Sequence, residues 1–544
     1  MQGLMMDDYP LTLTRLLERA RKYFPHKKVL TKTKDGYFAY TYEDFYERVQ
    51  RLARALTEMG VKEGDRVASF AWNSHRHLEL YFAVPAIGAV LHTVNIRLFP
   101  EQIAFIVNHA EDKVMFVDDS LFEPLSKLAP HFKTVERYIV MGESTEQPAQ
   151  PEGLEAPTES YEALLEKHDP DFTFPELDER TACVMCYTSG TTGNPKGVLY
   201  SHRSLVLHSI AVGGTDGLAL SERDRILTIV PMFHANAWSL PFGATMLGAT
   251  QIFPGPFMDP HSLASMVEEQ KVTFSSGVPT IWIGLLQDQK EHNHDLSSLR
   301  LITSGGAALP VSMIEAFDGL GIPIIQGWGM TETGPVGSLS WVKGDLAGLP
   351  ENERARLRAK QGLAMPLIEL RLIGDDGTEQ PWDGKAMGEV QIRGPWVATE
   401  YYKDERPGEQ WHDGWLKTGD VGVIDSEGYL QLVDRAKDLV KSGGEWISSV
   451  DLEGAIMGHP KVLEAAVIGV AHPKWQERPL ACVVVKPGEE LTKEEVLSFL
   501  QDKVAKWWLP DDVVFLEEIP KTSVGKFSKK ELRAQFEDYK LPTV

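Results

Sequence analysis

The stretch from Tyr187 to Val198, with the sequence YTSGTTGNPKGV, constrains the fold of this chain more than any other. It holds three glycines, four Ser or Thr hydroxyls and one lysine, directly after an apolar run, Ala182 to Cys186, that predicts a buried strand. Hydroxyls and backbone N–H groups of a Gly-rich turn form a concave anion site, and the lysine adds a positive charge. A helix with Ser201 as its N-cap is predicted next. The order of strand, turn and helix therefore predicts a phosphate-binding loop in an α/β fold.

This turn differs from the common P-loop. In that loop the lysine is followed directly by Ser or Thr, whose hydroxyl reaches Mg²⁺. Here Gly197 follows Lys196, and Pro195 precedes it. A polar surface turn is the alternative interpretation, but it would not need so many hydroxyls together with glycine at three positions. Phosphate binding is favoured.

Size and charge limit the class of protein. The 544 residues exceed the roughly 250–300 at which single cores stop growing, so at least two domains are expected. The net charge of −23 argues against a nucleic-acid partner, which requires clustered Lys and Arg. The longest apolar run, Leu80 to Leu91, is interrupted by Pro85 and Gly88 and falls short of the roughly 20 residues that span a bilayer. No signal-peptide pattern is visible. We expect a cytoplasmic protein with no integral membrane segment.

Cys183 and Cys186 form a C-x-x-C pair, which can indicate a zinc or redox site. Both lie in the apolar strand that precedes the Gly-rich turn. Small buried hydrophobic residues are therefore the favoured interpretation.

Repeated patterns predict the domain organisation. Residues 65–90 and 224–250 each read as strand, apolar helix, Gly-Ala and strand, which indicates two β/α layers with parallel sheets. Thr41 and Asp44 predict a capping box at the start of an amphipathic helix over 41–59. Residues 142–180, rich in Glu, Pro, Asp and Thr, predict a surface excursion. Residues 362–428 alternate short strands with turns, and an α+β pattern begins near Asp434, with a helix over 492–507 that a Thr492–Glu495 capping box opens. We expect an α/β fold with a large N-terminal domain (1–433), made of two layered β/α subdomains and a small β subdomain, and a small mobile α+β C-terminal domain (434–544).

Several further motifs follow the Gly-rich turn in a fixed order: GGA at 305–307, QGWGMTET at 326–333, WLKTGD at 415–420, DRAKD at 434–438, KSGGEW at 441–446 and PKTSVGK at 520–526. Together they resemble the adenylate-forming (ANL) superfamily, which includes acyl-CoA synthetases, luciferases and peptide-synthetase adenylation domains. The resemblance covers the chain from about Thr41 to Phe536.

The resemblance implies a nucleotide site with Mg²⁺ as the cofactor. Glu332 is a hard oxygen donor of the kind that Mg²⁺ prefers, and Thr188 would share the ion. Asp420 and Arg435 would bind the ribose, and Thr331 would reach the α-phosphate. The full set implied for ATP and AMP is Thr188, Ser189, Gly190, Thr191, Thr192, Lys196, Gly305, Gly306, Gln326, Gly327, Trp328, Thr331, Asp420, Arg435 and Lys437.

The segment PMFHANAW at 231–238 resembles the fatty acyl-CoA synthetase motif. The resemblance implies that His234, Trp238 and Gly305 line an acyl site, although a lone histidine among apolar residues is more often structural. Peptide-synthetase adenylation domains carry an aspartate where His234 stands, to pair with the ammonium of the substrate. Its absence disfavours amino acids, whose charge would be buried unpaired.

The C-terminal motifs imply movement and CoA binding. By resemblance, Asp434 is the hinge between the domains, and Lys441, Gly443, Gly444 and Trp446 bound a CoA channel. Lys526 resembles the adenylation lysine, a cation that stabilises the charge of the transition state at the α-phosphate. The catalytic residues implied are Lys526, His234, Thr188 and Glu332.

The sequence therefore predicts an ATP-dependent ligase that forms acyl-CoA from a medium- or long-chain fatty acid through an acyl-adenylate, with release of AMP and pyrophosphate. The likeness is greatest to fatty acyl-CoA synthetases and 3-methylthiopropionate-CoA ligases, so a short-chain acid is the alternative substrate. A luciferase-like adenylating oxygenase and a non-catalytic nucleotide-binding protein are more remote alternatives. Since relatives are often homodimers, a homodimer is expected.

Overall fold

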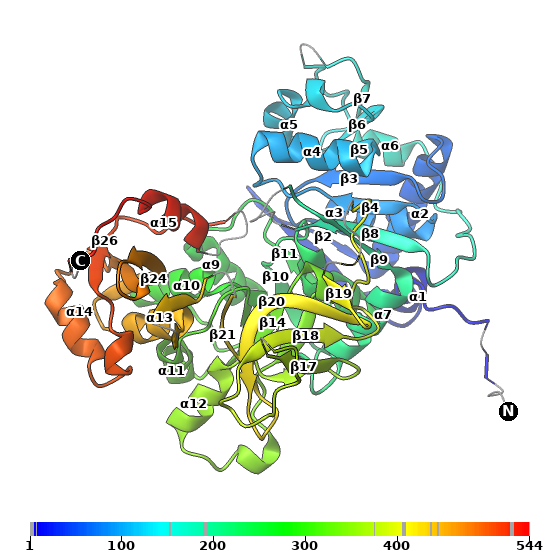
Figure 1. The fold of residues 1–544 in the computed structure, drawn as a ribbon. Helices are drawn as coiled ribbons and strands as arrows, with labels where there is room; N and C mark the ends of the chain where they lie inside the picture. Colours follow the sequence, from blue (N-terminus) through cyan, green and yellow to red (C-terminus); the bar gives the residue numbers. More distant parts are fainter. Residues whose placement is uncertain are drawn as a thin grey trace.

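The computed structural model describes residues 5–6, 8–151, 154–188, 194–374, 376–404, 408, 410–435, 438–442, 445–522 and 527–542, with only the backbone of residues 435, 445 and 446. Within this part, four sheets organise the chain (Figure 1).

The first sheet lies in the N-terminal part of the chain. Its strands are parallel except for the last pair, and their order is β7 (Thr158–Ser160), β6 (Arg137–Met141), β5 (Asp112–Asp118), β3 (Arg66–Phe70), β4 (Val90–Thr93), β8 (Ala182–Tyr187) and β9 (Gly197–Ser201).

The second sheet is the larger one. Its central strands are parallel, and its order is β16 (Leu363–Ala364), β15 (Val336–Leu339), β14 (Ile324–Gly329), β13 (Leu301–Gly305), β12 (Phe274–Gly277), β10 (Arg225–Thr228), β11 (Thr250–Phe253), β1 (Lys28–Thr33) and β2 (Gly36–Thr41).

Helices form three layers around these two sheets. Residues of α1 (Leu13–Tyr23), α2 (Tyr42–Glu58), α3 (His75–Ala86), α7 (His202–Gly213) and α8 (Leu240–Leu247) share one buried cluster with strands of both sheets. The outer face of the first sheet packs on α4 (Pro100–Ala110) and α5 (Asp119–Ser126), whereas α6 (Tyr161–Glu166) contacts α2 and belongs to the shared buried cluster. The outer face of the second sheet packs on α9 (Pro260–Gln270), α10 (Pro279–His292), α11 (Val311–Gly319) and α12 (Glu351–Ala359).

Two smaller sheets follow. The antiparallel β subdomain contains β17 (Glu369–Ile373), β18 (Gly388–Arg393), β19 (Trp411–His412), β20 (Trp415–Ile424) and β21 (Leu430–Arg435). The C-terminal sheet contains β22 (Val440–Ser442), β23 (Glu445–Ile447), β24 (Val462–His472), β25 (Gln476–Val485) and β26 (Asp512–Phe515), with helices α13 (Ser449–Met457), α14 (Lys493–Leu500) and α15 (Lys529–Gln535). The division proposed at residue 434 falls in the last strand of the β subdomain.

Local sequence signals explain several of these elements. Thr41 and Asp44 form the predicted capping box of α2: the Thr41 N–H donates to Asp44 Oδ2 at 2.8 Å, and the Asp44 N–H donates to Thr41 Oγ1 at 3.2 Å. Ser201 caps α7 through the Ser204 N–H. Both predicted repeats, β3–α3–β4 and β10–α8–β11, are present at the predicted positions, and the two strands of each repeat pair in parallel. The predicted α/β class is confirmed.

Three predictions were wrong in detail. The Gly-rich turn does not lead directly into a helix, because the chain first forms β9, antiparallel to β8, and only then α7. The helix expected over 492–507 ends at Leu500, and its Thr492–Glu495 capping box is present. The segment 142–180, expected as a surface excursion, includes β7 and α6, whose Tyr161 is fully buried.

The two cysteines of the C-x-x-C pair lie in the hydrophobic core. Cys183 and Cys186 are both buried in β8, as predicted. Burial raises the pKa of the Cys186 thiol to about 11 and shifts that of Cys183 in the same direction. Neither group ionises near neutral pH.

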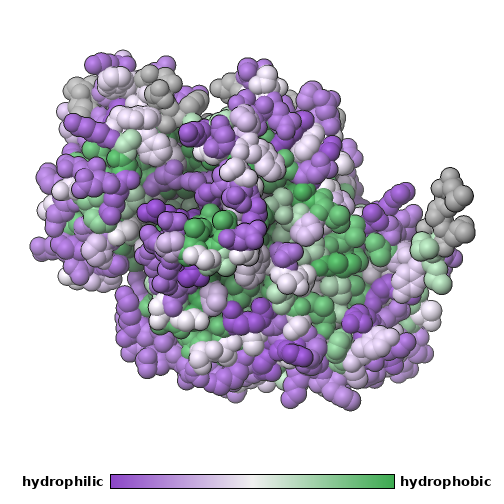
Figure 2. Space-filling view, turned by 90° about the horizontal axis from the view of Figure 1, so that it is seen from below, coloured by the Kyte–Doolittle hydropathy of each residue, from purple (hydrophilic) through white to green (hydrophobic). Residues whose placement is uncertain are grey.

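Figure 2 shows hydrophilic residues over most of the face it presents, with apolar residues gathered toward the centre of that face. Among the described residues, no helix combines the length and the apolar character needed to cross a bilayer.

Candidate functional site

The base of the Gly-rich turn is closed by two hydrogen bonds. The Thr188 N–H donates to the Lys196 carbonyl at 2.9 Å, and the Lys196 N–H donates to Thr188 Oγ1 at 3.1 Å. The second bond uses a lone pair of the Thr188 hydroxyl and not its proton. Lys196 Nζ lies 3.6 Å from Asp404 Oδ2 and 4.4 Å from the centre of the Tyr401 ring. The predicted phosphate contacts within the turn, Ser189, Gly190, Thr191 and Thr192, lie outside the described residues.

Glu332 lies in the short helix η3 (Thr331–Thr333), which follows β14. Its side chain is buried, and Oε1 accepts a hydrogen bond from the Tyr401 hydroxyl at 2.5 Å. The Tyr200 hydroxyl donates to the Thr331 carbonyl at 2.6 Å, and the Ala398 N–H donates to the Glu332 carbonyl at 2.8 Å. Burial, together with the Glu332 charge, raises the pKa of Tyr401, so this phenol stays a donor.

These residues fit a magnesium ion. Mg²⁺ prefers carboxylate and hydroxyl oxygens, and Glu332 and Thr188 offer both. Tyr401 connects the two, because it donates to Glu332 while Lys196, whose backbone is bonded to Thr188, lies over its ring. A hydrogen-bonded partner of this kind orients a metal-binding carboxylate. Neither Tyr401 nor Tyr200 was predicted, and no local pattern could have revealed them, since Tyr401 is 69 residues from its partner.

Gly305 brings the predicted acyl and nucleotide residues together. It pairs with Gly327 between the parallel strands β13 and β14. A Cβ atom at Gly305 would lie 2.8 Å from Trp238 Cη2 and 3.0 Å from the Gly327 carbonyl oxygen. Only glycine therefore allows the Trp238 ring to lie against this edge. Gly306 follows with φ of +82°, in the region that glycine favours.

Gln326 has a structural contact beside this edge. Its Oε1 accepts a hydrogen bond from the Leu309 N–H at 2.8 Å, and its own N–H donates to Ser340 Oγ at 2.7 Å. The side chain thereby ties β14 to the segment that follows β13. Gln326 thus positions the turn that contains Gly305 and Gly306.

The segment after His234 has an unusual backbone. The five residues from Ala235 to Ser239 all have positive φ, between +43° and +59°. Left-handed conformation costs a non-glycine residue roughly 1–2 kcal/mol. Such strain is concentrated at ligand sites, where the surrounding packing maintains it. Here Asn236 is fully buried and accepts a hydrogen bond from Cys186 Sγ at 3.5 Å. This backbone conformation places the Trp238 ring beside Gly305.

The predicted ribose contacts lie on neighbouring strands. Asp420 is buried in β20, and the Trp328 Nε1–H donates to Asp420 Oδ2 at 2.9 Å. Asp420 is the register partner of Arg435 in β21. The Arg435 side chain and all of Lys437 lie outside the described residues. The structure thus joins Asp420 to Trp328 of the large sheet.

The C-terminal motifs begin at this strand. Asp434 is buried, and its Oδ2 accepts hydrogen bonds from the Ser449 N–H at 3.0 Å and from the Ser449 hydroxyl. Lys441 is exposed, donates its N–H to Glu477 Oε2 at 2.9 Å and pairs with Trp446 between β22 and β23. Gly443, Gly444, Lys526 and the Trp446 side chain lie outside the described residues.

Comparisons with known proteins identify the family. The profile of the AMP-binding enzyme family matches residues 17–402, and that of the AMP-binding enzyme C-terminal domain matches residues 451–526. A long-chain-fatty-acid–CoA ligase of Thermus thermophilus is 49% identical, and a 3-methylmercaptopropionyl-CoA ligase of Ruegeria pomeroyi is 43% identical, each over 99% of both chains. The solved structure of ATP-bound MatB from Rhodopseudomonas palustris superimposes with a TM-score of 0.83, at 27% identity, over 98% of this chain and 100% of that one. The predicted membership is confirmed: this chain belongs to the AMP-binding enzyme family of adenylate-forming proteins.

Proposed function

We propose that this protein is an ATP-dependent ligase that joins a medium- or long-chain fatty acid to CoA through an acyl-adenylate. The observation that carries the proposal is the contact of Trp238 with Gly305, the strand partner of Gly327. One sheet edge thereby supports the motif expected to bind the acid and the motif expected to bind the nucleotide. A carboxylate oxygen and the α-phosphorus must meet at such a place. The two ligases named above support the same reaction class.

In the first step, a carboxylate oxygen of the acid attacks the α-phosphorus of ATP. A carboxyl-to-phosphate bond forms, the bond to the β-phosphate breaks, and pyrophosphate leaves. The hydroxyls of Thr188 and Thr331 donate to phosphate oxygens, and Asp420 accepts from the ribose hydroxyls. Glu332 and Thr188 would hold Mg²⁺, which would supply positive charge to the phosphates. Lys526 supplies a second positive charge between the carboxylate and the α-phosphate.

In the second step, the C-terminal domain turns about Asp434 and withdraws Lys526. The segment from Lys441 to Trp446 then bounds the path of CoA, with Gly443 and Gly444 as its narrow wall. The CoA thiol loses its proton and attacks the carbonyl carbon of the acyl-adenylate. The thioester forms and AMP leaves. Such domain closure is a hinge motion.

The length of the acyl site determines which of two substrate classes the protein accepts. Each buried methylene contributes about 0.8 kcal/mol, which is about a fourfold gain in kcat/KM. A long apolar site beside His234 and Trp238 would give this gain over many carbons. A closed site would favour a short acid, as the name of the Ruegeria relative indicates for that protein. We propose fatty acids, because the segment 231–238 resembles the fatty acyl enzymes.

The test is pyrophosphate release over straight-chain acids of increasing length and 3-methylthiopropionate, with and without CoA. The proposal predicts about one pyrophosphate per site without CoA, steady turnover with CoA, and kcat/KM that rises with length into the fatty-acid range. Lys526→Ala should lose pyrophosphate release and keep nucleotide binding. A maximum at 3-methylthiopropionate would assign the short-chain activity. Light emission with a luciferin, and no thioester, would overturn the ligase.

The resemblance also supports three finer proposals: a requirement for Mg²⁺, a cytoplasmic location and a homodimer. Light scattering of the purified chain tests the last of these. A mass of one chain would contradict it.

A further inference from the structure

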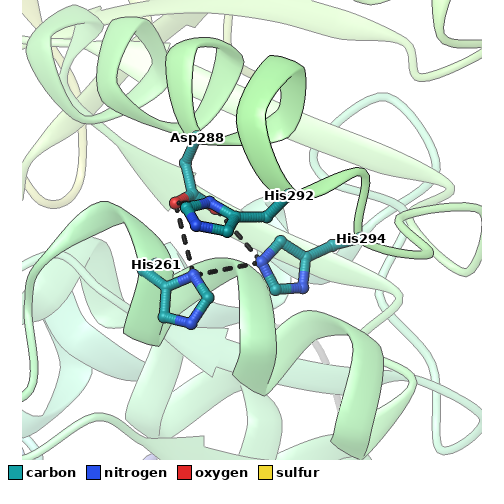
Figure 3. Close-up of side chains that lie close together, drawn as sticks. All are labelled: His261, Asp288, His292 and His294. Carbon is teal, nitrogen blue, oxygen red and sulfur yellow. Dashed lines mark hydrogen bonds and ion pairs between the residues drawn. The ribbon is translucent and has the colours of Figure 1, made fainter.

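Three histidines and an aspartate meet on the outer face of the larger sheet, in a place that the ligase reaction does not use (Figure 3). Asp288 and His292 lie one turn apart at the end of α10, His294 follows in the next loop, and His261 lies in the first turn of α9. The four side chains point toward one another, and their possible ligand atoms all lie within 4.8 Å of one another.

We propose that His261, Asp288, His292 and His294 bind a divalent transition metal ion, with Zn²⁺ as the expected occupant. Three imidazoles and one carboxylate make a four-ligand set that is typical of tetrahedral zinc. The ion would join α9 to α10, the two helices that precede and follow β12 in the chain. It is separate in chemistry from the proposed Mg²⁺ site, whose ligands are oxygens only.

The distances fit this geometry. With metal–ligand bonds of about 2.0–2.2 Å, neighbouring ligand atoms of a tetrahedral site lie about 3.3–3.6 Å apart. His261 Nδ1 lies 3.3 Å from Asp288 Oδ1 and 3.3 Å from His294 Nε2. His294 Nε2 lies 3.2 Å from Asp288 Oδ2. His292 Nδ1 is closer to Asp288 Oδ1, at 2.8 Å, and has to open by about half an ångström.

A second, independent observation is the support of the His294 ring. Its other nitrogen, Nδ1, lies 3.0 Å from Glu268 Oε2 on α9, which directs Nε2 toward the cluster. A carboxylate bonded to the far nitrogen of a ligand histidine is the usual outer support of a zinc site. The Gln289 side chain donates to the His294 carbonyl at 2.9 Å and fixes the loop. The charge of Glu268 would also complete the neutralisation of a divalent ion bound to Asp288.

Burial and access are both suitable. The Asp288 side chain is only 7% exposed, and its Oδ2 is a buried atom that lies 3.2 Å from His294 Nε2 but meets no hydrogen-bond geometry within the described part of the chain. Leaving a buried carboxylate oxygen without a donor is costly, and a cation removes that cost. His261 and His292, at 56% and 46% exposed, leave the cluster open to solvent on one side. An ion can therefore enter without unfolding of either helix.

The experiment uses the full chain without a polyhistidine tag, stripped with EDTA and titrated with Zn²⁺ alone. We expect one Zn²⁺ per chain, binding at least tenfold weaker in His292→Ala/His294→Ala, and unchanged binding in the control His26→Ala/His131→Ala, whose histidines are exposed elsewhere. At a hundredfold excess over Kd, Zn²⁺ should raise Tm of the wild type by about 2 °C. Mg²⁺ should not compete.

Co²⁺ in the unmutated chain provides a measurement that does not depend on how the variant folds. Tetrahedral coordination gives intense visible absorption, and we expect it to appear at one equivalent and to disappear on addition of Zn²⁺. Three results would overturn the proposal: no Zn²⁺ bound by the wild type, equal binding by the cluster variant, or only weak octahedral Co²⁺ bands. The cluster would then be a hydrogen-bonded group that joins α9 to α10. None of these readouts depends on ligase activity.

Discussion

The buried carboxylates of the candidate site and those at the junction with the C-terminal domain are held by different partners. Glu332 accepts a hydrogen bond from a phenol, and Asp420 from an indole. At the junction, Lys529 Nζ lies 2.9 Å from Glu453 Oε1 and 3.9 Å from Asp434 Oδ1. A neutral donor fixes the direction of a carboxylate and leaves the carboxylate negatively charged. A buried cation also balances that negative charge. We infer that the first arrangement serves ligand binding and the second serves stability.

The junction is a compact network. Lys529, on α15, also donates to the Ser449 hydroxyl, and Glu453, on α13, accepts from the Val467 N–H at 2.7 Å. Burial opposes the charge of Lys529, but attraction by Glu453 and Asp434 exceeds this effect and raises its pKa. One cation thus joins the last helix, α13 and the end of β21. Lys529 was not among the residues predicted from the sequence.

The largest effect is expected from Lys529→Met. The change leaves Glu453 and Asp434 buried without their shared cation, and breaking such a pair costs about 3–5 kcal/mol. Urea unfolding should show this loss, while Lys530→Met, at the exposed next residue, should change stability by less than about 0.5 kcal/mol. Lys529→Met/Glu453→Gln should recover part of the loss. If Lys529→Met and Lys530→Met were equally stable, the distinction between the carboxylates of the candidate site and those of the junction would no longer hold.

A smaller effect, on activity and not on stability, is expected from Glu332→Gln. Glutamine can still accept from Tyr401, so the fold should lose less than about 1 kcal/mol. Loss of the charge should lower ATP-dependent pyrophosphate release by about 10²- to 10³-fold. Glu400→Gln, at an exposed neighbour of Tyr401, is the matched control. If Glu332→Gln lost mainly stability and little activity, Glu332 would belong with the carboxylates that stabilise the junction.

Tyr401→Phe tests whether the phenol acts by orienting Glu332. Loss of a partner that orients a metal ligand typically costs about 10- to 100-fold. We expect activity to fall by that amount, with a higher Mg²⁺ concentration needed for half-maximal rate. In the Glu332→Gln background the same change should have little further effect. Additive losses, or an unchanged Mg²⁺ requirement, would show that Tyr401 acts in another way.

Sequence reasoning succeeded where the signal is local. The capping box of Thr41 and Asp44 and the cap of Ser201 depend on residues three apart, and both are present. The motifs also predicted that Asp420, Trp328 and Glu332 serve one site, and the structure joins Asp420 to Trp328.

The features that sequence reasoning missed depend mostly on contacts between residues far apart in the chain. β9 exists because residues 197–201 pair with β8, which no property of those five residues demands. Tyr401 and Glu332 are 69 residues apart, and His261 and His294 are 33 apart. Single-sequence patterns contain no distance between such residues. The helix expected to reach Trp507 ends at Leu500 without a proline or glycine to mark its end.

The smallest effect is expected in the pH dependence of stability, from Asp451 in the first turn of α13. Burial raises the pKa of Asp451 to about 6 from its ordinary 3.8, and the charge of Asp434 acts in the same direction. The folded chain therefore keeps this proton at pH values where the unfolded chain has lost it. Stability from this group is full below pH 3.8 and falls as pH rises toward about 6, by about 1.4 kcal/mol per pH unit at most.

Asp451→Asn removes this titration and keeps a side chain of the same size. Between pH 5 and pH 6 the free energy of unfolding of the wild type should therefore fall by about 1 kcal/mol relative to that of the variant. Asp376→Asn, on an exposed turn, should follow the wild type. Parallel curves for wild type and Asp451→Asn would mean that Asp451 is already ionised at pH 5. The junction would then hold a further buried negative charge beside Asp434.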